Sequence, residues 1–133
     1  MPAVSPIDHL RKYLQAIEEF APAEVLATFF TADALQHEFP NRLFASGRQH
    51  DLPAMLAASD KGRQILASQR YELRNVLGDG DQIAAEIEWT GVLRAGFGPL
   101  AAGAKMRAAL GMFFRFRDGK IASIHNYDCY DPF

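Results

Sequence analysis

The chain has 133 residues, of which 49% are hydrophobic and 11% aromatic, and its formal net charge at pH 7 is −2. This length is typical of one domain and too short for two independent cores. The 14 basic and 16 acidic residues are mixed along the chain. Because binding to a row of phosphates needs clustered positive charge, nucleic-acid binding is disfavoured. We therefore expect a single domain over residues 1–133.

The N-terminus and the cysteine content bear on the compartment. Residues 1–6 lack the charged start and the continuous apolar stretch of a signal peptide. No later run approaches the ~20 apolar residues of a membrane span. Cys129 is the single cysteine, which excludes an internal disulfide and a cysteine-based zinc site. These features predict a cytoplasmic protein without a membrane segment.

Helical patterns dominate the first half of the chain. Apolar residues at helical spacing predict helices over residues 6–20 and 52–67, the latter capped by Asp51. A shorter helix begins at Pro22 and extends to include Phe30 in its apolar face. Between this shorter helix and the one predicted over residues 52–67, apolar and polar side chains alternate over residues 34–39, which predicts a short strand.

From residue 69 onward the polarity alternates with the period of two that is typical of strands. Strands are predicted over residues 70–74 and 85–90, and a terminal hairpin over 106–117 and 120–130. The expected inward residues are Ile87, Trp89, Met112, Phe114 and Phe116. The expected outward residues are Glu86, Glu88, Arg107, Arg115 and Arg117. Helices followed by an antiparallel sheet indicate the α+β class.

Four segments carry recognisable motifs: HEFPNRL at 37–43, EIEWTG at 86–91, FRFRDGKI at 114–121 and NYDCYDPF at 126–133. Together they resemble the SnoaL-like family of the NTF2-like superfamily across nearly the whole chain. The resemblance implies a cone with three N-terminal helices packed in a curved antiparallel (mixed) sheet of about four to six strands. It also implies a pocket open at one end and a homodimer. Members include a ketosteroid isomerase, polyketide cyclases, an epoxide hydrolase and dehydratases.

The neighbouring residues His37 and Glu38 are the first catalytic candidates. Adjacent strand residues face opposite sides, so only one of the two can point into the pocket. If Phe39 is buried, His37 shares its face and could act as a general base. A count from Ala34 without gaps instead puts Glu38 where isomerase-like members carry their catalytic carboxylate. The assignment between the two stays open at this point.

The last predicted strand is unusually polar for the wall of a small domain, and its facing depends on the turn at Asp118–Gly119. A three-residue turn directs Asn126 and Asp128 inward. A two-residue turn directs His125 and Tyr127 inward instead. We favour the first, because it is the usual turn of the resembled family. Asn126 then falls where epoxide hydrolases carry a catalytic Asp, and Asp128 is the remaining acid.

Two catalytic arrangements of the resembled family are incomplete in this sequence. Tyr13 matches the phenol that stabilises the oxyanion in isomerase-like members, but the second donor position is Met112. A thioether cannot donate a hydrogen bond. Asn126 cannot take a proton as a catalytic Asp does. Steroid isomerase and epoxide hydrolase activities are therefore disfavoured.

The function predicted from these residues is a cofactor-independent isomerase, cyclase or dehydratase acting by acid–base chemistry on a small apolar carbonyl or hydroxyl compound. The catalytic candidates are His37, Glu38 and Asp128. The expected ligand-binding residues are Tyr13, Phe39, Trp89, Met112, Phe114, Asn126 and Tyr130. No metal site is expected, because the four histidines are scattered without a ligand spacing. The alternative is a non-catalytic small-ligand-binding or dimeric interaction module.

Overall fold

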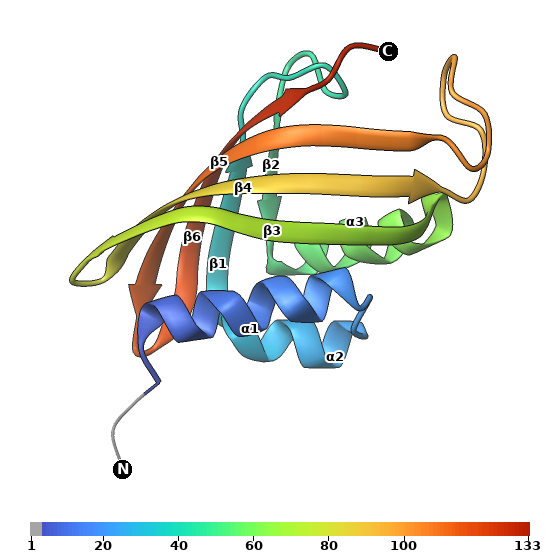
Figure 1. Cartoon of the computed structure of the whole chain (residues 1–133). Coiled ribbons are helices and arrows are strands. Elements are labelled where there is room, and N and C mark those ends of the chain that lie inside the picture. Colours follow the sequence, from blue (N-terminus) through green and yellow to red (C-terminus); the bar gives the residue numbers. More distant parts are fainter. Residues whose placement is uncertain (1–3) are drawn as a thin grey trace.

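The fold is a strongly bent sheet of six strands with helices packed against its concave side (Figure 1). The computed structural model describes residues 4–133. Residues 1–3, part of the segment from which the absence of a signal peptide was predicted, lie outside the described residues. The helices are α1 (Pro6–Glu18), α2 (Ala23–Leu26), the 3-10 turn η1 (Ala27–Phe29) and α3 (Leu52–Ile65). The strands are β1 (Phe30–Glu38), β2 (Arg48–Asp51), β3 (Leu66–Asp79), β4 (Gln82–Leu93), β5 (Lys105–Arg117) and β6 (Lys120–Tyr130).

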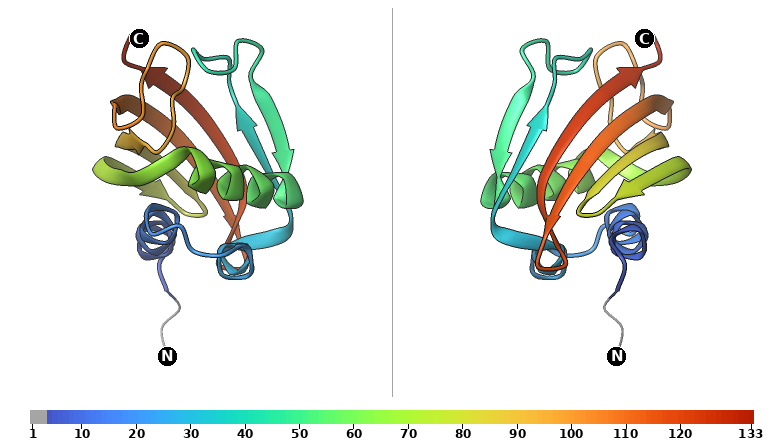
Figure 2. Two further views of the ribbon diagram at one scale, coloured as in Figure 1. Left: turned by 90° about the vertical axis from the view of Figure 1, so that its right-hand side faces the viewer. Right: turned by 90° about the vertical axis from the view of Figure 1, so that its left-hand side faces the viewer.

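The strand order is β2-β1-β6-β5-β4-β3. β1 and β6 are parallel, and every other neighbouring pair is antiparallel. The sheet forms two arms with α3 bridging them, while α1 and α2 lie below (Figure 2). This arrangement confirms the predicted α+β cone and adds β2, a strand that was not predicted. None of the helices within residues 4–133 is long and apolar enough to cross a membrane.

The helix starts follow the capping residues of the sequence. Ser5 Oγ accepts from the backbone N–H of Asp8 at 3.1 Å, and Asp51 Oδ1 accepts from that of Ala54 at 3.0 Å. α1 ends two residues earlier than predicted, and Phe20 beyond it has a positive φ of 55°. The second helix is also shorter than predicted, because Phe30 begins β1.

The facing of β6 is determined by two local features. Asp118 and Gly119 both have positive φ, 52° and 76°, and form a two-residue turn, so the predicted three-residue turn is wrong. Ala122 is then an extra residue in β6, and this β-bulge shifts the alternation by one position. Asn126 and Asp128 consequently point inward, as predicted. The combination of a two-residue turn and a bulge produces this facing, in place of the three-residue turn that was expected.

The two faces of the β4–β5 region also follow the predicted alternation. Ile87, Trp89, Met112, Phe114 and Phe116 are all buried against the helices and the opposite arm. The outer face carries ion pairs between exposed arginines and the half-buried Glu88. Glu88 accepts from Arg74 at 2.5 Å and from Arg107 at 3.1 Å. The core therefore lies on the concave side, where a pocket can form.

Candidate functional site

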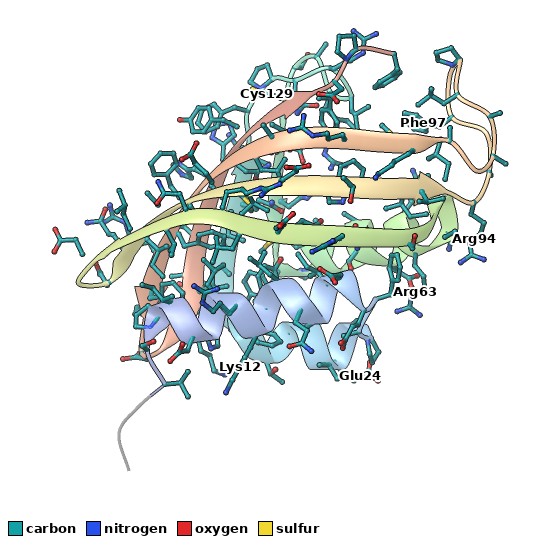
Figure 3. All side chains as sticks on the ribbon, viewed as in Figure 1. Lys12, Glu24, Arg63, Arg94, Phe97 and Cys129 are labelled. Atoms are coloured by element: carbon teal, nitrogen blue, oxygen red, sulfur yellow. The ribbon has the colours of Figure 1, made fainter. Side chains whose placement is uncertain are left out.

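The concave side of the sheet encloses a cavity of about 300 Å³. This volume lies at the lower end of the range for small-molecule sites. Much of its wall is apolar and comes from α1, the end of α3, β4, β5 and the β4–β5 loop, from which Phe97 projects (Figure 3). The apolar wall includes Ile17, Leu66, Trp89, Leu93, Phe97 and Met106. Its charged side chains and the amides of Gln36 and Asn126 gather where β1, β2 and β6 lie side by side.

A chain of hydrogen bonds runs through this polar end. Gln36 Nε2 donates to Asn126 Oδ1 at 2.9 Å, and Asn126 Nδ2 donates to Asp128 Oδ1 and Oδ2 at 3.0 and 2.9 Å. Asn126 is only 4% exposed, and both ends of its amide have partners. Its backbone C=O also accepts from the N–H of Phe39 at 3.0 Å, which ties β6 to the end of β1. Asp128 is therefore held in one orientation toward the cavity.

The carboxyl group of Asp128 is hard to ionise in this position. Burial raises its pKa from 3.8 to about 6, because the charged form loses its hydration. The nearby negative charge of Glu38 acts in the same direction, whereas the hydrogen bond from Asn126 and the positive charge of Arg48 oppose it. Near neutral pH both protonation states of Asp128 are therefore accessible.

Glu38 has a different environment at the same end of the cavity. It pairs with Arg48 across the β1–β2 ladder, with Oε2 3.1 Å from Nε and Oε1 3.2 Å from Nη2. The guanidinium carbon of Arg48 lies 3.5 Å from the centre of the Phe44 ring. The Glu38 side chain is 12% exposed, so this bidentate pair fixes a negative charge where little water reaches it.

Three tyrosines belong to the same cavity as these carboxyl groups. Tyr13, Tyr71 and Tyr130 line the cavity, and burial raises the pKa of each phenol well above its usual value. They stay protonated at neutral pH and can donate a hydrogen bond to a ligand oxygen. Two other lining residues are hydrogen-bonded to each other: Trp89 Nε1 donates to Gln69 Oε1 at 3.1 Å.

The structure places most of the predicted site residues around one cavity. Its lining includes seven of them: Tyr13, Glu38, Trp89, Met112, Asn126, Asp128 and Tyr130. His37 and Phe39 do not line it, because the strand alternation puts them on the outer face, where their rings stack 3.9 Å apart. Phe114 lies in the core, 2% exposed, and is not part of the cavity wall. Those three placements correct the prediction.

Four polar lining residues were missed: Gln36, Arg48, Gln69 and Tyr71. Two of them follow from residues that were identified. Gln36 is two positions before Glu38 and shares its face, and Tyr71 pairs directly with Trp89 across β3 and β4. Arg48 lies on the unpredicted β2. Within the described residues, no group of three or more His, Cys, Asp or Glu side chains could hold a metal ion.

Comparisons with solved structures agree with this architecture. IdmH from Streptomyces antibioticus, a proposed polyketide cyclase, has a TM-score of 0.79 at 18% identity, with 94% of this chain and 92% of that chain covered. AclR from Streptomyces galilaeus, a proposed hydroxylase, has a TM-score of 0.75 at 14% identity, with 92% and 74% covered. A SnoaL-like polyketide cyclase from Agrobacterium tumefaciens has a TM-score of 0.73 at 17% identity, with 94% and 91% covered. At these identities the likeness concerns the fold.

Sequence comparison identifies the family. No curated protein matches this chain. The family model of the SnoaL-like domain matches residues 10–124, which is most of the chain, and the match ends within β6, before Asn126 and Asp128. This protein therefore belongs to the SnoaL-like family.

Proposed function

We propose that this protein is a cofactor-independent acid–base enzyme that moves a proton at the carbon next to the carbonyl of a small, mostly apolar compound. The observation that carries the proposal is Asp128, a carboxyl group with a pKa of about 6 that faces an apolar cavity. A base with a pKa near the working pH can both take and return a proton. Isomerases, cyclases and dehydratases of this kind share that first step.

The cavity residues divide the work of such a step between them. Ionised Asp128 removes the proton from carbon, and negative charge then develops on the carbonyl oxygen. The protonated phenols of Tyr13, Tyr71 and Tyr130 are available to donate a hydrogen bond to that oxygen. Asn126 holds the base, and the Glu38–Arg48 pair supplies fixed charges beside it. The apolar wall accommodates the rest of the substrate.

The names of two similar structures support the choice of a carbonyl substrate. IdmH and the Agrobacterium protein are described as polyketide cyclases, one of them as a proposal. Polyketides carry many carbonyl groups, and removal of a proton next to one of them can begin carbon–carbon bond formation. We propose the same substrate class for this chain.

The test is the exchange of a proton of 2-tetralone, a small ketone, for deuterium in heavy water, followed by proton NMR. The wild-type protein is expected to speed this exchange, with a rate that rises with pH around 6, where Asp128 ionises. Asp128→Asn is expected to lose ~100-fold or more of the acceleration. Asp118→Asn, in the exposed β5–β6 turn, is the matched control and should behave as wild type.

Two outcomes would contradict the proposal. The first is an Asp128→Asn variant that is folded and exchanges 2-tetralone as fast as wild type. The second is tight binding of the ketone to the wild-type protein, seen as shifted NMR signals of Trp89 and Tyr130, with no exchange above the buffer rate. That second result would favour a non-catalytic ligand-binding module.

We also propose that the chain forms a homodimer through the outer face of its sheet, in the cytoplasm. Phe113 and Tyr127 are 53% and 47% exposed there, and the ring of Tyr127 stacks on Phe39 at 4.3 Å. Such a patch is typical of an interaction surface. The same face carries both Glu and Arg side chains, so two copies need not repel each other.

The single thiol, Cys129, is exposed, which fits a reducing compartment (Figure 3).

Analytical ultracentrifugation tests the dimer. The wild-type protein is expected to sediment as a dimer at micromolar concentration, and Phe113→Glu as a monomer with an unchanged circular dichroism spectrum. A wild-type protein that sediments as a monomer at every concentration would contradict this part of the proposal.

A further inference from the structure

The buried amide of Asn126 joins side chains from two strands. Gln36 on β1 and Asn126 on β6 are 90 residues apart in the sequence, and their side chains meet because β1 and β6 are parallel neighbours. The same amide donates to both oxygens of Asp128. With Asn126 only 4% exposed, water has little access to replace either partner.

The direction of these hydrogen bonds follows from the chemistry of the groups. An ionised carboxylate only accepts hydrogen bonds, so Asn126 must present its NH2 group to Asp128. The carbonyl oxygen of the amide then points the other way and needs a donor. Gln36 supplies that donor through Nε2 at 2.9 Å. Gln36 also lines the cavity but takes no direct part in the proposed proton transfer.

We infer that Gln36 is a positioning residue, which orients the amide of Asn126 and thereby favours the ionised form of Asp128. This inference rests on the proposed function, in which Asp128 is the base, but it concerns a property of Asp128 that can be measured without a substrate. When Gln36 is replaced by a residue without a donor, the amide also populates the flipped orientation. Its oxygen then faces Asp128, and only a protonated carboxyl group can pair with it.

Other charged and titratable groups face Asp128 and have to be kept constant. Glu38 on β1 disfavours its ionised form, and Arg48 on β2 favours it. Tyr130 on β6 and Tyr71 on β3 also lie close enough to interact with its charge, and both remain neutral because burial raises their pKa. Gln36→Met leaves all four groups in place and adds no charge, so it reports on the orientation of the amide.

The test is the titration of the Asp128 side-chain carboxyl carbon by carbon-13 NMR in the full-length protein. Gln36→Met keeps the length of the side chain but has no donor, and it is expected to raise the titration midpoint by about half a pH unit. Gln36→Glu needs a donor from Asn126 and so holds the flipped amide, and it also brings a negative charge close to Asp128; the two effects together are expected to raise the midpoint by about one unit or more. Gln49→Glu, on the exposed side of β2, adds the same charge and should leave the midpoint within about 0.2 units.

Either of two results would overturn the inference. One is a folded Gln36→Met variant whose Asp128 titrates at the wild-type midpoint. The other is a Gln49→Glu shift as large as that of Gln36→Glu, since charge alone would then explain the effect. A purely structural role for Gln36 would lower the stability of the protein without moving the midpoint. Should wild type fail to exchange 2-tetralone while the midpoints shift as expected, the proposed function fails and the positioning role of Gln36 stands.

Discussion

Successive residues of β1 and β6 point alternately to the inner and the outer face of the sheet, and the side chains on the two faces have different environments. On the inner face, Gln36, Asn126 and Asp128 are hydrogen-bonded to one another and largely removed from water. On the outer face, the rings of His37 and Tyr127 stack against neighbouring aromatics and stay partly exposed. Burial on one face alters protonation, whereas exposure on the other leaves a surface free for contact.

This difference depends on a shift of one residue along the strand. Without the bulge at Ala122, the two-residue turn before β6 would place His125 and Tyr127 in the cavity and Asp128 outside. An acid on the outer face would be hydrated. The proposed chemistry thus depends on a backbone irregularity that contributes no side chain to the site.

The largest difference in stability between the inner and outer faces is expected for substitutions at two neighbouring residues of β5. Phe114→Ala should lower the free energy of unfolding by about 3 to 5 kcal/mol, because the ring is 2% exposed and its removal leaves a cavity in the core. Arg115→Ala, on the opposite face, should change it by no more than about 0.5 kcal/mol. Urea unfolding followed by circular dichroism measures both. Equal losses would mean that the two faces of the sheet do not differ in burial.

A smaller effect, with the opposite sign, is expected at Asp128. Its pKa in the folded protein is about 6 against an ordinary value of 3.8, so between these values the folded state binds more protons than the unfolded state. Stability contributed by this group is therefore lost as the pH rises from about 4 to 6. Asp128→Asn removes the penalty and should stabilise the protein by up to about 3 kcal/mol above pH 7, with little change below pH 4.

The measurement for this second prediction is the free energy of unfolding of wild type and Asp128→Asn across the pH range. Asp118→Asn, in the exposed turn, is the control and should follow the wild-type curve. If Asp128→Asn destabilises the protein equally at every pH, Asp128 is a structural acid, and the contrast between the two faces does not extend to protonation.

Much of the inner face could be predicted from the sequence, because local patterns determine it. Period-two alternation identified Trp89 and Met112 as inward residues, and Asp51 identified the start of α3. The choice between His37 and Glu38 could not be made in this way. It depends on where β1 begins its pairing, which is a contact with residues far along the chain.

The partners of the catalytic candidates were harder to predict. β2 has the sequence RQHD, whose four residues show no alternation of apolar and polar side chains, so it forms a strand only by pairing with β1. Arg48 could therefore not be matched to Glu38 from the sequence. The bulge at Ala122 leaves no mark in composition either. In both cases tertiary contacts, rather than local preference, decide the structure.

The smallest effects compare an ion pair inside the cone with one on the outer face. Arg48→Met leaves the Glu38 carboxylate, 12% exposed, without its bidentate partner, and should cost about 2 kcal/mol of unfolding free energy at neutral pH. Adding Glu38→Gln should recover part of that loss, because the unpaired charge is then gone. Arg107→Met breaks contacts of 3.1 Å to Glu88 and 3.0 Å to Asp131, whose side chains are 23% and 54% exposed, and should cost less.

The salt dependence of the stability loss distinguishes the two kinds of ion pair. At about 1 M sodium chloride the Debye length falls to about 3 Å, so the loss caused by Arg107→Met should disappear while that of Arg48→Met persists. Urea unfolding at low and high salt measures both. If the two losses respond equally to salt, solvent reaches the Glu38–Arg48 pair freely. The low-water environment that raises the pKa of the neighbouring Asp128 would then be absent as well.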